Sequence, residues 1–153
     1  MPTNIIRKAN KVAAGKPAGQ RALARKRAIA INVGGIPLVA HLLPSETAAR
    51  VHSALPLYGI AETWGQAVHF ELPMALGRER GARINGILGD VYVWAEEQRI
   101  ILPFGPTPIS GKNEIRLPRP CNVLARIEGD LSKDIEALKE IQPGTKISIM
   151  RHG

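Results

Sequence analysis

The sequence contains a single cysteine, few aromatic residues and no long apolar run. One cysteine, Cys121, excludes a disulfide within the chain and a metal site built from clustered cysteines. The most apolar stretch, residues 28–43, is interrupted by polar and turn-forming residues and falls short of the about 18 apolar residues of a membrane-spanning helix. The four histidines are scattered without zinc-type spacing. We therefore expect no metal, no cofactor and no membrane span, and a reducing, cytoplasmic setting.

Acidic residues are absent from the first 30 residues, which carry eight of the 21 basic side chains. The remainder holds 13 basic and 13 acidic side chains, so the net charge of +8 lies ahead of a neutral domain. We expect residues 1–27 to be a basic, flexible N-terminal arm and residues 28–153 to be one domain with its own core.

Three interpretations of the arm stay open. It is a solvated mobile segment, a leader removed by processing, or a segment that binds nucleic acid, anionic lipid or another acidic partner. No aromatic residue interleaves its charges, so base stacking has no support. The candidates for binding an anion are Arg21, Arg25, Lys26 and Arg27.

Glycine and proline divide the domain into short segments. The β-prone runs 28–33 and 36–42 flank Gly34-Gly35, which predicts a tight hairpin. Ser45 is placed to cap a helix that ends near Leu55. The remaining pattern predicts strands over 61–71, 121–128 and 146–151, a short helix over 131–138, and loops over 77–89 and 111–120. Such a pattern is typical of a mainly β closed barrel with two short helices.

The stretch from Gly89 to Ser110 is the most informative part of the chain, because it holds a strand, a polar turn, a second strand and a Pro-rich loop. Side chains alternate along a strand, so Asp90, Tyr92 and Trp94 share one face and the valines between them share the other. The valine face predicts core. A face that carries a carboxylate, a phenol and an indole is a candidate binding surface.

Two interpretations of the aromatic residues remain open. Trp64, Tyr92, Trp94 and Phe104 are four of the six aromatic residues of the chain, and they either fill the core or line a ligand pocket. Asp90 with Glu96-Glu97 also raises the possibility of a carboxylate pair for acid–base chemistry. Turn tips and a loop-holding carboxylate explain these residues as well, and the catalytic residues stay unknown.

The segment 89–110, read as GD, an aromatic strand, a short turn, an apolar strand and FGPTP, resembles the cyclophilin-like family of small prokaryotic proteins. Three flanking motifs occur in the same order: Thr63-Trp64-Gly65 before a strand, Asn122-Val123 leading into ARIEGDL, and TKISIM at the end. The resemblance covers residues 29–151.

The resemblance implies a closed eight-stranded barrel, distantly related to the cyclophilin peptidyl-prolyl isomerases, and no agreed activity. It also brings polar residues beside the aromatic ones, which gives a candidate ligand site of Thr63, Trp64, Asp90, Tyr92, Trp94, Phe104, Thr107 and Asn122. Cyclophilin isomerases carry a catalytic arginine within a Phe-His-Arg motif. The corresponding segment here, AETWGQAVHF, has no arginine to stabilise a twisted amide.

We therefore expect a protein that binds a small molecule or an extended peptide on an aromatic-lined barrel face, without prolyl isomerase activity. Two alternatives remain. The first is an enzyme using the same pocket, either a divergent isomerase or a lyase or hydrolase. The second is a protein that engages nucleic acid or another acidic partner through its basic arm. The sequence leaves the oligomeric state unknown.

Overall fold

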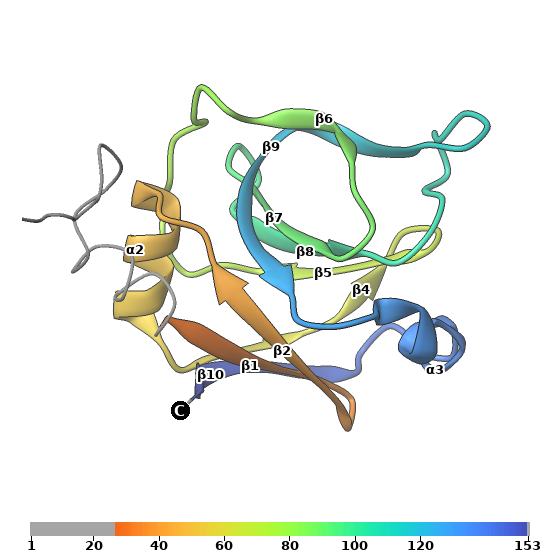
Figure 1. Ribbon diagram of the computed structural model, residues 1–153, viewed down its shortest axis with the longest axis horizontal. Helices are drawn as coiled ribbons and strands as arrows, with labels where there is room; N and C mark the ends of the chain where they lie inside the picture. Colours follow the sequence, from red (N-terminus) through yellow and green to blue (C-terminus); the bar gives the residue numbers. More distant parts are fainter. Residues whose placement is uncertain (1–26, 153) are drawn as a thin grey trace, which may run out of the picture.

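The computed structural model describes residues 27–152, which form one continuous antiparallel sheet with short helices at its ends (Figure 1). No helix in this part of the chain is long and apolar enough to cross a membrane. In chain order the elements are β1 (Ala28–Val33), β2 (Ile36–Leu42), α2 (Glu46–Ala54), β3 (Leu57–Ile60), β4 (Glu62–Thr63), β5 (Ala67–Glu71), β6 (Arg83–Gly86), β7 (Asp90–Trp94), β8 (Arg99–Pro103), β9 (Ile115–Ile127), the 3-10 turn η1 (Leu131–Asp134), α3 (Ile135–Lys139) and β10 (Lys146–His152).

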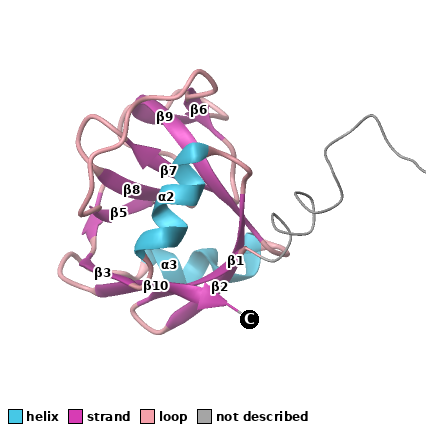
Figure 2. Cartoon of the chain, turned by 90° about the vertical axis from the view of Figure 1, so that its left-hand side faces the viewer, coloured by secondary structure: helices cyan, strands magenta, loops and turns pink. Residues whose placement is uncertain are grey.

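The strands follow the order β3-β10-β1-β2-β9-β7-β8-β5-β4, and β6 pairs with β9 off this path. The strands at the two ends of the path, β3 and β4, are separated in the chain by Ala61 alone. One extended segment therefore pairs with β10 through its first half and with β5 through its second half. The helices α2 and α3 lie at opposite ends of this curved sheet (Figures 1 and 2).

The inner face of the sheet encloses the main hydrophobic core. Its buried side chains come from every long strand and from α2, and they include Ile29, Leu38, Val51, Phe70 and Leu124. A second, smaller cluster consists of Ala67, Tyr92, Ile101, Leu117 and Cys121. This second cluster forms because the first half of β9 crosses over the other side of β7 and β8.

Local sequence explains the first hairpin and the first helix. Gly34 and Gly35 both adopt positive φ, as a two-residue turn between β1 and β2 requires. The side chain of Ser45 accepts a hydrogen bond from the backbone N–H of Ala48, which caps α2. The hairpin and the capped helix are confirmed, as is the expectation of a mainly β fold with two short helices.

Three predicted boundaries are wrong. The strand expected over 61–71 is a hairpin, because residues 64–66 turn with Gly65 at a φ of 58°. The loop expected over 77–89 contains β6, and the loop expected over 111–120 contains the first half of β9. The two missed segments pair with each other although β7 and β8 lie between them in the chain, so neither carries a local signal. The strand count over residues 27–152 is ten.

The β1–β2 turn offers a test of the fold. A Cβ added to Gly34 would lie 2.5 Å from the Thr145 methyl group, whereas a Cβ added to Gly35 would meet nothing within 4 Å. We expect Gly35→Ala to lower the free energy of unfolding by about 1 kcal/mol through backbone strain alone. Gly34→Ala adds the clash and should lower it further, which urea unfolding midpoints will measure. Equal losses for the two variants would contradict this packing.

Candidate functional site

Asp90 begins β7 as a buried carboxylate with a dedicated partner. It is 2% exposed, and one of its oxygens accepts a hydrogen bond of 2.9 Å from Nε of Arg126, its register partner on β9. The bond to Asp90 raises the pKa of Arg126. The two charges balance each other where a lone buried carboxylate would be costly, so Asp90 holds β7 against β9.

Tyr92 lies at the centre of the second cluster and is fully buried. Its hydroxyl oxygen accepts a 2.7 Å hydrogen bond from the backbone N–H of Ile87, and burial raises the pKa of the phenol. The aromatic ring packs as core, and its one polar atom fastens the turn between β6 and β7.

Trp64 and Trp94 are partly buried and cover the second cluster from outside. The indole N–H of Trp94 is buried and finds no acceptor among the described residues. Its nitrogen is closed to solvent, so Trp94 as placed offers a ligand its ring rather than its donor.

Asn122 connects three segments that are far apart in the sequence. Its side-chain oxygen accepts from the N–H of Glu79 at 2.7 Å, and its amide nitrogen donates to the Gly77 carbonyl at 2.8 Å and to the Thr47 hydroxyl at 3.0 Å. Thr47 in turn donates from its hydroxyl and backbone N–H to the Glu79 carboxylate. This network, which we call the Asn122 staple, ties β9 to the start of α2 and to the loop before β6.

Thr107 is another buried polar residue with internal partners. Its hydroxyl donates to the carbonyl of Arg116 at 2.6 Å, and its backbone N–H donates to Ser110 Oγ at 2.9 Å. The residue thereby fixes the loop after β8 against the start of β9. Like Asp90, Tyr92 and Asn122, it has its polar groups satisfied within the protein.

The remaining two predicted residues, Thr63 and Phe104, meet at a cleft of about 370 Å³ at the α3 end of the barrel. Its lining combines the apolar Phe104, Leu138, Ile141 and Pro143 with Gly65 and the polar Thr63, Gln66, Lys139 and Gln142. We call it the α3 cleft. Phe104 also lines an adjoining hollow of about 420 Å³ beside the loop 105–114.

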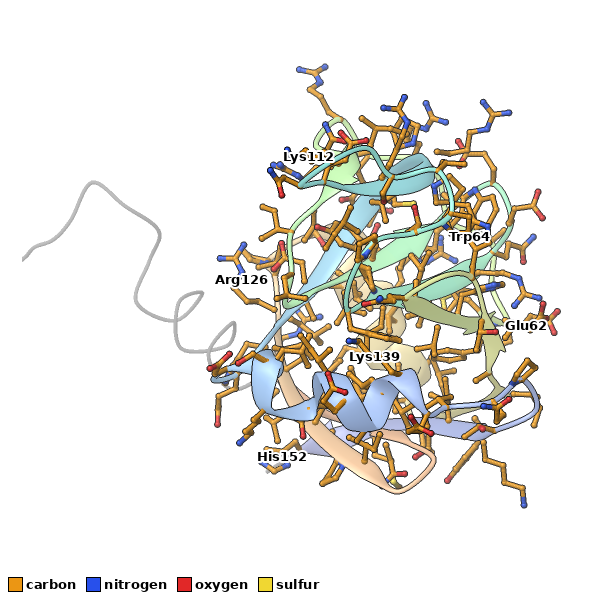
Figure 3. All side chains as sticks on the ribbon, turned by 90° about the vertical axis from the view of Figure 1, so that its right-hand side faces the viewer. Glu62, Trp64, Lys112, Arg126, Lys139 and His152 are labelled. Carbon is orange, nitrogen blue, oxygen red and sulfur yellow. The ribbon has the colours of Figure 1, made fainter. Side chains whose placement is uncertain are left out.

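The eight predicted residues therefore do not form one site. In Figure 3, Arg126, which marks the position of Asp90, lies on the opposite side of the molecule from Trp64. Lys139 lies on the side of α3 that faces the strands above it, at the α3 cleft (Figure 3). No sequence pattern indicated a role for Lys139, because a lysine in the last turn of a short amphipathic helix is common.

The carboxylates considered for acid–base chemistry are also apart. Asp90 begins β7, and Glu96 follows the end of that strand, where it pairs with Arg78. Its own backbone N–H and Arg78 lower the pKa of Glu96. Each carboxylate has a separate cation, so the two do not share a proton.

Arg99 is the guanidinium that sequence reasoning missed. It lies on β8 in register with Glu71 of β5 and with Trp94 of β7, and it donates to Glu62 at 2.7 Å. His69, on the same strand as Glu71, has its pKa lowered by burial and by Arg99. The pairing of β8 with β5 brings Arg99 beside the arginine-free segment 61–70, and this pairing cannot be read from the sequence.

Among the predicted anion-binding residues, the structure describes Arg27, which directly precedes β1. Its charge contributes, after burial, to the lowered pKa of His52 on α2. Arg21, Arg25 and Lys26 lie outside the described residues. The arm and its three interpretations stay predictions.

The order of strands, the two short helices and the sheet-enclosed core define a mainly β fold of the barrel type. The model of the Cyclophilin-like family matches residues 27–150. The chain therefore belongs to the Cyclophilin-like family, as the resemblance implied.

Two solved structures share this fold. The solution structure of the hypothetical protein AF2241 from Archaeoglobus fulgidus has a TM-score of 0.68 and 26% identity, over 84% of this chain and 97% of that one. McbB, solved in complex with tryptophan, has a TM-score of 0.57 and 17% identity, over 82% of this chain and 45% of that one. A comparison with curated proteins found no match.

The Asn122 staple predicts a large loss of stability in one variant. Asn122→Ala leaves the Gly77 carbonyl and the Glu79 N–H without their partner, so we expect the free energy of unfolding to fall by about 2–4 kcal/mol. Asn85→Ala, an exposed asparagine on β6, is the control and should change it by less than about 0.5 kcal/mol. Chemical denaturation measures both, and similar losses would contradict the staple.

Cys121 provides a test of the second cluster. Burial, reinforced by the nearby Glu96 charge, raises the pKa of this thiol to about 12. The thiolate is the reactive form, so at pH 8 the folded protein should react with a disulfide reagent ~100-fold or more slowly than the unfolded chain. Reaction at the same rate before and after addition of urea would show that the cluster is open.

Proposed function

We propose that this Cyclophilin-like protein binds a small amphipathic organic acid in the α3 cleft. The observation that carries the proposal is a cleft lining that combines apolar side chains with polar ones, among them Lys139. Its volume of about 370 Å³ falls within the range of small-molecule sites. A ligand with an apolar body against Phe104 and a carboxylate toward Lys139 fits this mixed lining.

The charge of Lys139 is accessible to a ligand. Its ammonium group lies 3.2 Å from Glu136, three residues earlier on α3, and the Glu136 side chain is 88% exposed. Such exposed pairs within a helix are weak, because water screens both charges. A ligand carboxylate therefore replaces Glu136 as the partner of Lys139 at little cost.

Thr63 supplies the neutral polar contact. It is exposed at the end of β4, and its hydroxyl makes no hydrogen bond with another described residue. A hydroxyl that both donates and accepts suits a carboxylate or an amine equally. The two predicted ligand residues at this cleft, Thr63 and Phe104, thus take different parts, one polar and one apolar.

Prolyl isomerase activity is not part of the proposal. The cation nearest in register to the arginine-free segment, Arg99, is engaged by Glu62 at 2.7 Å. An isomerase needs a preorganised donor aimed at the twisted amide, in a site that admits an extended peptide. Arg99 lines neither the α3 cleft nor the hollow beside the loop 105–114.

The ligand panel follows from this chemistry. It contains small aromatic and aliphatic carboxylic acids, matched to their uncharged amides. Tryptophan belongs in the panel because McbB, which shares the fold at 17% identity, was solved in complex with it. That likeness shows the fold alone, so tryptophan is one member among several.

Calorimetric titration of the full chain should find saturable binding of at least one acid and weaker binding of its amide. Lys139→Met should weaken the acid about fivefold or more, and Thr63→Val should weaken it less, since one charged and one neutral contact are lost. Lys133→Met, an exposed lysine on η1 outside the cleft lining, is the matched control. Absence of binding across the panel, or binding unchanged in both cleft variants, would contradict the proposal.

A further inference from the structure

A separate hollow lies across strands β3 and β10. It has a volume of about 490 Å³ and is lined by Asn32, Tyr58, Gly59, Ile60, Lys146, Ile147 and Ser148. We call it the β3 groove. It shares no lining residue with the α3 cleft, so the two hollows are separate.

The β3 groove exposes large apolar side chains without a partner in the described chain. Tyr58 is 69% exposed and Ile60 is 55% exposed, and Met150 on the neighbouring β10 is 44% exposed. Gly59 between them faces inward, since a Cβ there would lie 2.6 Å from the ring of Phe70. Tyr58 and Ile60 therefore share the outward face, where contiguous apolar surface marks an interaction site.

The β3 strand also has a free edge. It stands at one end of the strand order and pairs with β10, and no ladder occupies its other edge within residues 27–152. A strand edge without a partner presents unpaired N–H and C=O groups to an incoming extended segment. Strand addition of this kind combines backbone hydrogen bonds with pockets for alternate side chains.

Charge distinguishes between the partners that fit this edge. Lys146 is in register with Ile60, is exposed, and forms no ion pair with another described residue. No aspartate or glutamate lines the groove. A second copy that docked groove to groove would bring another Lys146 and no acidic residue from its own groove, whereas an acidic segment complements the groove.

We propose that the β3 groove is a docking site for an extended acidic segment of a partner protein, which adds a strand to the free edge of β3. Apolar side chains of the segment pack on Tyr58 and Ile60, and a carboxylate beside them pairs with Lys146. This interaction is separate from ligand binding at the α3 cleft and stands whether or not that proposal holds.

The test uses the full chain and two fluorescent peptides of about seven residues, one alternating valine with glutamate and one alternating valine with lysine. Fluorescence polarisation should show binding of the glutamate peptide. Lys146→Glu should weaken it about fivefold or more and favour the lysine peptide instead. Lys112→Glu is the matched charge reversal: Lys112 lies at the far end of the molecule from His152, which ends β10 (Figure 3), and this variant should bind as the parent does.

Two further measurements separate strand addition from charge attraction. A glutamate peptide with proline at alternate positions lacks the N–H groups along one of its edges, so it should bind more weakly. Tyr58→Ser should weaken the original peptide, and Ile109→Ser, which alters an exposed isoleucine outside the groove, should not. Thermal unfolding of each variant establishes that it is folded.

Three outcomes would overturn the proposal. The first is an absence of glutamate-peptide binding. The second is binding that is the same in Lys146→Glu and Lys112→Glu, which would place the peptide elsewhere on this basic chain. The third is a concentration-dependent dimer in sedimentation experiments that Tyr58→Ser dissociates, which would assign the groove to a second copy.

Discussion

The fold depends on one long strand that serves three neighbours. β9 spans Ile115–Ile127 and pairs with β6, β7 and β2 along its length. Its first half contributes Leu117 and Cys121 to the second cluster, and its second half contributes Leu124 to the main core. Because one strand is common to both clusters, a shift of its register would turn inward side chains outward in both at once.

The constraint on β9 explains why β7 is buried on both faces. Val91 and Val93 point into the main core, while Tyr92 points into the second cluster that the start of β9 closes. The face that carries Asp90, Tyr92 and Trp94 is therefore covered by the protein's own chain. Its polar atoms are used to fix β9 and the adjoining turn, as the bonds of Asp90 and Tyr92 show.

Sequence reasoning succeeded where the determining contacts are local. The Gly34-Gly35 hairpin and the Ser45 cap depend on residues within a few positions, and the family motifs in 89–110 carried the fold class. It failed for β3, β6 and the first half of β9, whose pairing partners are distant. Pro118 and Pro120 lie in the segment 111–120, which was expected to be a loop. This half of β9 instead pairs with β6 along one edge, and the N–H groups that the two prolines lack are tolerated at its other edge.

The same distinction applies to function. Buried polar groups such as Asn122 and Thr107 give strong sequence signals because a fold needs specific residues to satisfy them, and here those needs are internal. A surface site needs polar groups that have no partner within the fold. Such groups belong to common residue types at strand edges and helix ends, which sequence patterns do not single out. Lys139 and Lys146 are of this kind: Lys139 lies outside the family motifs, Lys146 lies inside TKISIM without a role that the motif indicates, and each becomes notable only through the apolar surface beside it. The motifs in this chain therefore identify the fold, whereas the α3 cleft and the β3 groove become visible only when the fold brings their lining residues together.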